Sequence, residues 1–217
     1  MKKKHILYLI LLLFSVCVIY DYLKIYNTED THDDNGFPID PVFYDNFLDD
    51  NDINILLNSC DNYRYSKVKN EDGSMIKDKG RTSTSCFIPK SKTKAYTLIK
   101  EKIKNIFNFE CELEDLQLTK YNGGEFYNPH YDYFKKLPSH EKQRLKTIFV
   151  YLKEPIEGGE TEFPKINKKF APKKGGAVMW TNCFKNGDGY ILRENSLHGG
   201  NPVKKGEKIG LNIWILG

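Results

Sequence analysis

Two histidines and one carboxylate form the clearest chemical pattern in this sequence. His130 and Asp132 are separated by one residue and follow a stretch that is typical of strand, turn and strand, whereas His198 lies far downstream in a glycine-rich segment. Alternate residues of a strand point to the same face, so His130 and Asp132 can bind one ion. A distant histidine would complete the set of two histidines and one carboxylate that holds Fe(II) and leaves coordination positions open for oxygen chemistry.

A histidine two residues before an aspartate is a weak signal by itself. The chain contains a second example, His32 followed by Asp34, in an acidic, turn-rich stretch without strand character. We therefore interpret His32 as a residue without a metal role. His140 lies in a charged loop and His5 in the basic N-terminal segment, and neither is a candidate ligand.

The elements that must position these side chains are helices first and strands afterwards. Apolar spacing predicts a helix over 47–60, with an acidic start that suits an N-cap, and a second helix over 93–109. Alternating or continuous apolar patterns then predict strands, separated by Gly-Gly turns, at 116–121, 147–152, 177–180 and 209–216. This order predicts an α+β domain with an all-β core, either a sandwich or a jelly roll.

The first 24 residues form a separate unit. Lys2, Lys3 and Lys4 precede an apolar run over 6–20, which is short for a full span but has tyrosines at its flanks. We interpret 1–24 as a membrane signal-anchor with the remaining chain in the endoplasmic reticulum lumen or outside the cell. A cleaved signal peptide and a buried helix are the alternatives. The polar residues 25–41 are interpreted as a linker, which leaves 42–217 as the catalytic domain.

Charge and cysteine content indicate which binding partners and which disulfide bonds are possible. The first 24 residues hold four of the 33 basic and one of the 29 acidic side chains, so the remaining chain is nearly neutral. A nucleic-acid binder needs a basic patch, and none is expected here. In the predicted topology four cysteines are luminal and could form up to two disulfides, with the pairing left open: Cys60, Cys86, Cys111 and Cys183.

Several blocks of the sequence resemble the prolyl 4-hydroxylases, which belong to the 2-oxoglutarate- and Fe(II)-dependent dioxygenases. The stretch from Tyr121 to Asp132 is similar to the family's Y-x-x-G-x-x-Y-x-x-H-x-D pattern. Gly158–Pro164 is similar to its GGET-x-F strand, and 175–180 to the next core strand. His198-Gly-Gly-Asn-Pro, with Lys208 ten residues on, resembles its distal histidine and cosubstrate lysine. The resemblance covers about 42–217 and implies a double-stranded β-helix with supporting N-terminal helices.

The same resemblance implies roles for particular residues. His130, Asp132 and His198 would hold Fe(II), and the ammonium group of Lys208 would pair with the far carboxylate of 2-oxoglutarate in a confined pocket. Tyr121 is expected to hydrogen-bond that carboxylate, and Thr161 to line the same pocket. Arg81 and Tyr127 are expected on the substrate side. Two further aromatic residues are expected only as core or pocket walls, Trp180 and Trp214.

The implied activity is peptidyl-proline 4-hydroxylation, with oxidative decarboxylation of 2-oxoglutarate to succinate and CO2 and with ascorbate keeping the iron reduced. A dioxygenase for another residue or a small molecule is one alternative; lysyl hydroxylases generally carry arginine where Lys208 stands, which argues against that branch. A non-enzymatic binding module predicts a broken triad, and the triad is intact. A zinc hydrolase would need a general base in H-E-x-x-H spacing, which the sequence lacks.

Overall fold

The computed structural model describes residues 31–69, 74–138 and 141–217. His32 to Gly217 form one compact unit. Within these ranges no helix is both long and apolar enough to cross a lipid bilayer. The predicted anchor at 1–24 lies outside the described residues, as do His5 and His140.

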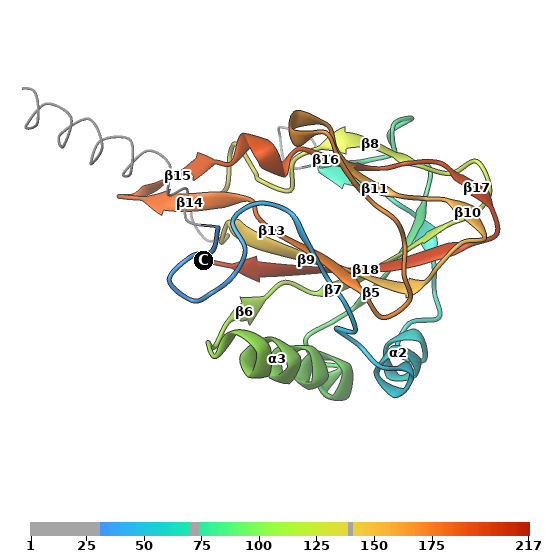
Figure 1. The fold of residues 1–217 in the computed structure, drawn as a ribbon, viewed down its shortest axis with the longest axis horizontal. Helices are drawn as coiled ribbons and strands as arrows, with labels where there is room; N and C mark the ends of the chain where they lie inside the picture. Colours follow the sequence, from blue (N-terminus) through green and yellow to red (C-terminus); the bar gives the residue numbers. More distant parts are fainter. Residues whose placement is uncertain (1–30, 70–73, 139–140) are drawn as a thin grey trace, which may run out of the picture. The chain divides into compact units, whose positions relative to one another are not determined.

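The two helices match the sequence predictions closely. Helix α2 spans Asp50–Leu57, and Asp49 caps it by accepting a hydrogen bond from the backbone of Asp52, whose side chain accepts from Asp49 in return. Helix α3 spans Thr93–Phe107 and ends at Asn108 in the left-handed conformation. Both helices pack on one face of the larger sheet (Figure 1).

The larger sheet has the strand order β1-β13-β9-β18-β7-β5-β2, with β6 also paired to β18. Its strands are β1 (Val42–Tyr44), β2 (Arg64–Tyr65), β5 (Thr84–Ile88), β6 (Glu112–Leu113), β7 (Leu116–Tyr121), β9 (Arg144–Lys153), β13 (Ala177–Thr181) and β18 (Lys208–Leu216). The four strands predicted from sequence all lie in this sheet, which is antiparallel throughout.

The smaller sheet has the order β12-β11-β16-β8, from strands β8 (Tyr127–His130), β11 (Thr161–Phe163), β12 (Lys168–Phe170) and β16 (His198–Gly200). Three two-stranded ribbons complete the described strands: β3 (Val68–Lys69) with β4 (Met75–Ile76), β10 (Glu157–Gly158) with β17 (Val203–Lys205), and β14 (Cys183–Asn186) with β15 (Gly189–Leu192). Short 3-10 turns occupy Pro164–Ile166 and Glu194–Ser196. This largely β architecture is consistent with the predicted jelly roll.

Strand β9 divides the interior into two regions because its side chains alternate between the two faces of the sheet. Ile148, Val150 and Leu152 belong to the main core beneath the helices. Phe149 and Tyr151 belong to a second cluster, together with Phe163 of the smaller sheet. The second face therefore looks toward the smaller sheet, and polar side chains placed there can meet residues of β8 and β16.

The segment 32–41 was expected to be linker, but it packs against the larger sheet. Phe37 is fully buried, with its ring 5.0 Å from that of Phe107. Thr181 donates its hydroxyl to the carbonyl of Pro38 at 3.0 Å. The compact unit accordingly begins at His32 instead of at residue 42. The reason is that Phe37 and Pro38, an apolar pair within a polar stretch, pack against the rest of the unit.

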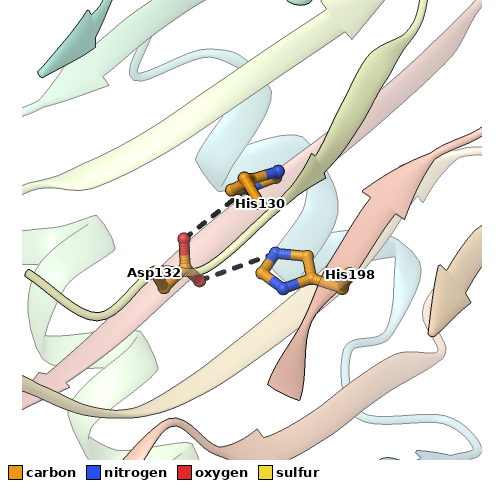
Figure 2. Close-up of side chains that lie close together, drawn as sticks. All are labelled: His130, Asp132 and His198. Carbon is orange, nitrogen blue, oxygen red and sulfur yellow. Dashed lines mark ion pairs between the residues drawn. The ribbon is translucent and has the colours of Figure 1, made fainter. Parts of the chain in front are cut away.

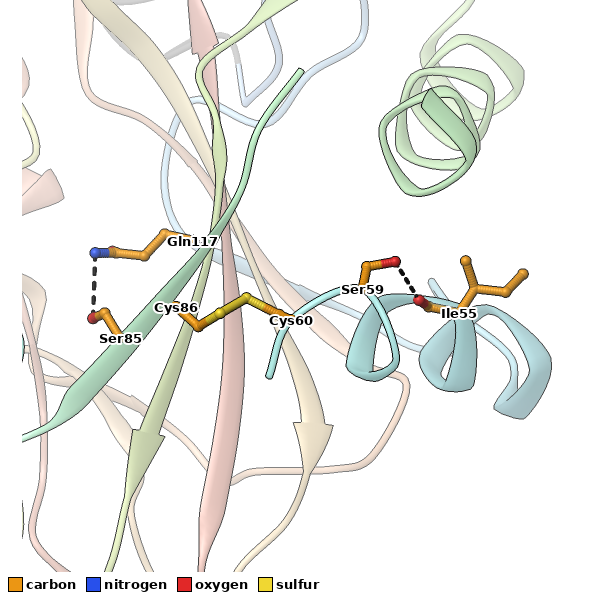
Figure 3. Close-up of a disulfide and its surroundings, with 6 residues drawn as sticks. All are labelled: Ile55, Ser59, Cys60, Ser85, Cys86 and Gln117. Carbon is orange, nitrogen blue, oxygen red and sulfur yellow. Dashed lines mark hydrogen bonds between the residues drawn. A yellow bond between two sulfur atoms is a disulfide. The ribbon is translucent and has the colours of Figure 1, made fainter. Parts of the chain in front are cut away.

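Of the alternative cysteine pairings, the structure contains Cys60 with Cys86, which joins the end of α2 to β5 (Figure 3). Cys111 and Cys183 are free thiols. Burial raises the pKa of Cys111 to about 11 and that of Cys183 to about 12, so both remain protonated and unreactive near neutral pH.

Removing this disulfide is expected to destabilise the fold. The bond links positions separated by 26 residues, and a loop of that size stabilises by about 3–4 kcal/mol, chiefly by restricting the unfolded chain. Urea denaturation of the Cys60→Ser/Cys86→Ser variant should show a loss of this size in the free energy of unfolding. Cys111→Ser is the control and should change it little. Identical unfolding of the wild type with and without reductant would contradict the prediction.

Candidate active site

The two histidines lie opposite each other on neighbouring strands of the smaller sheet. His130 is the last residue of β8, His198 is the first of β16, and the strand register pairs them directly. Asp132 lies beyond the end of β8, so it does not share a strand with His130 as expected. The bend that follows β8 nevertheless brings its carboxylate between the two imidazoles (Figure 2).

The distances suit one shared ion. Nε2 of His130 lies 3.8 Å from Oδ1 of Asp132, and Nε2 of His198 lies 3.8 Å from Oδ2. One ligand atom from each of the three residues can be chosen so that all lie within 4.8 Å of one another. His32 belongs to no such cluster in the described part of the chain. Two imidazoles and one carboxylate are a donor set that fits Fe(II).

Backbone contacts fix which nitrogen of each ring is available. Nδ1 of His130 lies 2.9 Å from the carbonyl of Asn128, and Nδ1 of His198 lies 2.8 Å from that of Ser196. A carbonyl only accepts, so in the neutral ring Nδ1 carries the proton and Nε2 keeps its lone pair for a metal. Burial lowers the pKa of His130 to about 3, which keeps that imidazole neutral at physiological pH.

Asp132 is buried but ionised. Burial by itself would raise its pKa, whereas electrostatic interactions with His198 and Arg144 and a hydrogen bond from Trp214 lower it to about 2. The hydroxyl of Thr147 and the indole N–H of Trp214 both donate to Oδ2, each at 2.8 Å. The Asp132 carboxylate is therefore charged, and its orientation is fixed by these two hydrogen bonds before any metal binds.

Lys208 supplies a buried cation on the opposite sheet. It begins β18, pairs with Tyr121 of β7, and is 2% exposed. Its ammonium donates to the carbonyl of Gly159 at 2.7 Å and lies about 5 Å from three aromatic rings. Burial lowers the pKa of Lys208 to about 7, and the charge of Glu160 offsets only part of that effect. A buried ammonium is costly without an anionic partner, so this position suits a ligand carboxylate.

Tyr121 and Thr161 adjoin this lysine but already have defined surroundings. Both residues are nearly buried and line the same cleft as Lys208. The hydroxyl of Thr161 accepts a hydrogen bond from Tyr151 at 2.7 Å. Burial raises the pKa of Tyr121, so its phenol stays protonated and can act as a donor. Their placement allows the expected contacts with a carboxylate held by Lys208.

Arg81 and Tyr127 form a stack over His130. The ring centroids of Tyr127 and His130 lie 3.6 Å apart, and the Arg81 guanidinium carbon lies 4.5 Å from the centroid of the Tyr127 ring. Arg81 also donates to Gln117 at 3.3 Å. Both stacked residues line the cleft. They lie next to the histidine and in a position to contact a substrate, with Tyr127 also limiting rotation of the ring.

Three polar residues near Asp132 were not singled out by sequence reasoning: Thr147, Asn182 and Arg144 in this role. Arg144 pairs with both oxygens of Glu114, at 2.6 and 2.7 Å, and stacks on Trp214 with 3.4 Å to the ring centroid. Trp214, expected only as a wall, donates to Asp132. No local motif marks these contacts, because each joins segments that are separated in the sequence.

One cleft of about 1480 Å3 is lined by the histidine pair, Asp132 and Lys208, whereas Thr147 and Asn182 are buried behind it. Its lining also includes Thr161, Arg81 and Phe134. The buried ammonium of Lys208 offers a partner for a small dianion in this cleft. The cleft volume leaves room for a larger molecule as well, so the arrangement can hold a metal ion, an acidic cosubstrate and a polymeric substrate together.

Comparison with known proteins adds independent information. The model of the 2OG-Fe(II) oxygenase superfamily matches residues 116–216. Prolyl 4-hydroxylase 2 of Arabidopsis thaliana is 30% identical, over 95% of this chain and 77% of that relative. A putative prolyl 4-hydroxylase of Acanthamoeba polyphaga mimivirus is 34% identical, over 47% of this chain and 44% of the relative.

Solved structures agree in fold. The viral collagen prolyl hydroxylase of Paramecium Bursaria Chlorella virus-1, crystallised as its 2OG complex, is 29% identical, with a TM-score of 0.65 over 82% of this chain and 96% of that one. A prolyl-4-hydroxylase of Pseudomonas putida is 15% identical, with a TM-score of 0.51 over 82% of this chain and 92% of that one, and shows likeness of fold alone.

Proposed function

Because this chain belongs to the prolyl 4-hydroxylase family of 2-oxoglutarate- and Fe(II)-dependent dioxygenases, we propose that it hydroxylates C4 of proline in a protein substrate. Peptidyl-proline, 2-oxoglutarate and dioxygen give peptidyl 4-hydroxyproline, succinate and CO2. One atom of dioxygen enters the hydroxyproline and the other enters the succinate. The observation that carries the proposal is the presence of His130, Asp132, His198 and Lys208 in one cleft.

In this reaction the residues of the protein bind and orient the metal ion, the cosubstrate and the substrate. His130 and His198 would hold iron through Nε2, and Asp132 through its carboxylate. When bound, Fe(II) supplies the redox chemistry that joins dioxygen to the cosubstrate and substrate. Ascorbate would keep that iron in its reduced state. Asp132, His198 and Lys208 are buried, which limits the contact of these three groups with bulk water.

Lys208 would bind the far carboxylate of 2-oxoglutarate, with Tyr121 donating a second hydrogen bond and Thr161 closing the pocket wall. Lysine at this position, instead of arginine, also favours a prolyl over a lysyl target. Arg81 and Tyr127 would contact the peptide where it passes the metal ligands. Their stack on His130 supports this placement, since a proline brought there would lie beside the iron.

The affinity for 2-oxoglutarate is expected to fall as the pH rises above about 7. In the free protein Lys208 loses its proton with a pKa of about 7, because burial disfavours the charged form. A bound carboxylate favours the ammonium, so binding above this pH takes up one proton and weakens by up to about tenfold per pH unit. Calorimetry of the Mn(II)-loaded protein in buffers of different ionisation enthalpy measures affinity and proton uptake. Equal affinity on both sides of neutrality would contradict the prediction.

Mass spectrometry of peptide products tests the function directly. The full chain is incubated with proline-rich peptides, Fe(II), 2-oxoglutarate and ascorbate, and the hydroxylated residue is identified against 4-hydroxyproline standards. We expect one added oxygen per modified proline, with succinate formed in equal amount. Lysine-containing peptides without proline serve as the comparison. Oxidation of lysine, or succinate release that no peptide stimulates, would refute the assignment to proline.

We also propose that residues 1–24 direct the enzyme to the secretory pathway as a membrane anchor, with the catalytic unit in the lumen or outside. The Cys60–Cys86 disulfide supports an oxidising compartment. A C-terminal tag should resist protease in sealed microsomes and stay with the membrane after carbonate washing. Protection followed by release into the wash would instead support a cleaved signal peptide, and digestion of the tag in sealed vesicles would refute luminal placement.

A further inference from the structure

Three residues stand side by side across the central strands of the larger sheet. Thr147 of β9 pairs with Trp180 of β13 on one side and with Trp214 of β18 on the other. All three are at most 5% exposed. They lie on the face that looks toward the smaller sheet, where Trp180 and Phe149 belong to the same cluster. Asp132 meets this row from the other side through Thr147 and Trp214.

A chain of hydrogen bonds connects one end of the row to the carboxylate. The indole N–H of Trp180 donates to Oδ1 of Asn182 at 2.8 Å. Nδ2 of Asn182 donates to the hydroxyl of Thr147 at 2.8 Å, and that hydroxyl donates to Oδ2 of Asp132 at 2.8 Å. Asn182 is fully buried, so water does not compete for these groups.

Donor and acceptor chemistry fixes the direction of every hydrogen bond from Trp180 to Asp132. An indole nitrogen only donates, so it fixes the amide of Asn182 with its oxygen toward Trp180 and its nitrogen toward Thr147. The hydroxyl oxygen of Thr147 then accepts from that nitrogen, and its proton is directed to Asp132. An ionised carboxylate only accepts, so the last bond completes the sequence without conflict. Each member thus determines the orientation of the next.

The same tryptophan also contacts a proposed metal ligand directly. The rings of Trp180 and His198 lie 4.6 Å apart between centroids, tilted by 56°. Trp180 therefore packs against His198 and, through Asn182 and Thr147, reaches Asp132. Trp214 adds a second donor to the same carboxylate oxygen. Two ligands from different segments are held relative to each other by one connected group of buried side chains.

We propose that Thr147, Asn182 and Trp180 are positioning residues that fix the Asp132 carboxylate relative to His198 for metal binding. The inference rests on the proposed function only in taking these two residues as ligands of one ion. Partners that orient metal ligands commonly contribute 10- to 100-fold in metal affinity. If these hydrogen bonds only satisfied buried polar groups, they would contribute to folding and leave the metal affinity unchanged.

Titration with Mn(II) alone tests the proposal without relying on turnover. Loss of the electron paramagnetic resonance signal of free Mn(II) reports binding to the full chain, with no cosubstrate or peptide present. Thr147→Val keeps the shape of the side chain and removes the hydroxyl. We expect its affinity for Mn(II) to fall by about 10- to 100-fold. Thr147→Ser restores a hydroxyl donor and should recover most of the affinity.

Thr181→Val is the matched control. Thr181 is a buried threonine of β13 whose hydroxyl donates to Pro38 instead of to the cluster. Its substitution removes one buried hydroxyl bond and should leave Mn(II) affinity at the wild-type value. Trp180→Phe keeps an aromatic ring near His198 but frees the amide of Asn182 to turn over. Its affinity should fall between those of the wild type and Thr147→Val.

Two results would overturn the proposal: wild-type Mn(II) affinity in folded Thr147→Val, or an equal loss in Thr181→Val. If circular dichroism shows that Thr147→Val does not fold, Trp180→Phe decides, and unchanged affinity there is equally fatal. A wild type that binds no Mn(II) removes the premise and the inference with it. Tight wild-type binding and weakened variants, without any hydroxylated proline, would refute the proposed function and leave this inference standing.

Discussion

Replacing His130 or His198 with alanine is expected to abolish both succinate formation and proline hydroxylation. Each substitution removes one of the three proposed ligands, whose candidate atoms lie within 4.8 Å of one another. Loss of a residue that only orients a ligand costs about 10- to 100-fold in affinity or activity, so loss of the ligand itself should cost more. The assay is succinate release at saturating 2-oxoglutarate, with Mn(II) affinity measured in parallel.

His32→Ala is the control for these variants, since His32 precedes an acidic residue at the same spacing but takes part in a short bridge with Pro38. Its turnover should match the wild type. Circular dichroism should show that the alanine variants at His130 and His198 remain folded, because both residues lie at the cleft and not in the main core. Activity in His130→Ala together with inactivity in His32→Ala would show that the ligand assignment is wrong.

Lys208→Ala is expected to weaken the use of 2-oxoglutarate by a hundred- to a few-thousand-fold. The substitution leaves the cosubstrate's carboxylate buried without its cation, and breaking a buried charge pair typically costs about 3–5 kcal/mol. At about 1.4 kcal/mol per tenfold change, this energy corresponds to the stated range. Mn(II) affinity should be unchanged, because Lys208 belongs to the other sheet and is not a ligand. The measurement is the KM for 2-oxoglutarate at saturating peptide.

Lys208→Arg should rescue only part of this loss, since the guanidinium keeps the charge but needs more space and a different bonding geometry. Lys204→Ala and Lys205→Ala are matched controls because both lysines are exposed, and they should leave the KM nearly unchanged. An unchanged KM in Lys208→Ala would exclude its role. The two arginines nearest to Lys208 in the sequence are already paired, Arg193 with Asp40 and Arg144 with Glu114, so neither is a ready substitute.

The sequence allowed prediction of what depends on local pattern. The acidic start of α2 and the apolar spacing of α3 predicted both helices to within a few residues, and alternation predicted the main strands. The spacing of His130 and Asp132, with a distant histidine, selected the three residues that the structure brings together. These features follow from periodicities of the backbone, which are visible in the residues themselves.

Contacts between distant segments could not be predicted in the same way. Thr147 of β9 reaches Asp132, which follows β8, only through the packing of segments from two different sheets, and no motif near Thr147 indicates that contact. The pairing of Cys60 with Cys86 was one of several equal possibilities until the strands were placed. Phe37 lies in a polar stretch, and only the packed structure shows that the core accepts it. In each case the contact depends on how distant segments pack in three dimensions, and the local sequence pattern contains little information about that packing.

The direct pairing of His130 with His198 makes metal binding dependent on chain closure. The two residues come from segments separated by β9 to β15, so their pairing closes a long loop of the polypeptide. Such non-local contacts carry a loop-closure entropy cost and are typical of slowly folding topologies. An ion that needs both histidines binds the finished fold and not the unfolded chain. At a concentration about 100 times its dissociation constant, such an ion would favour the folded state by about 2.7 kcal/mol, so the supply of iron would also affect the stability of the fold.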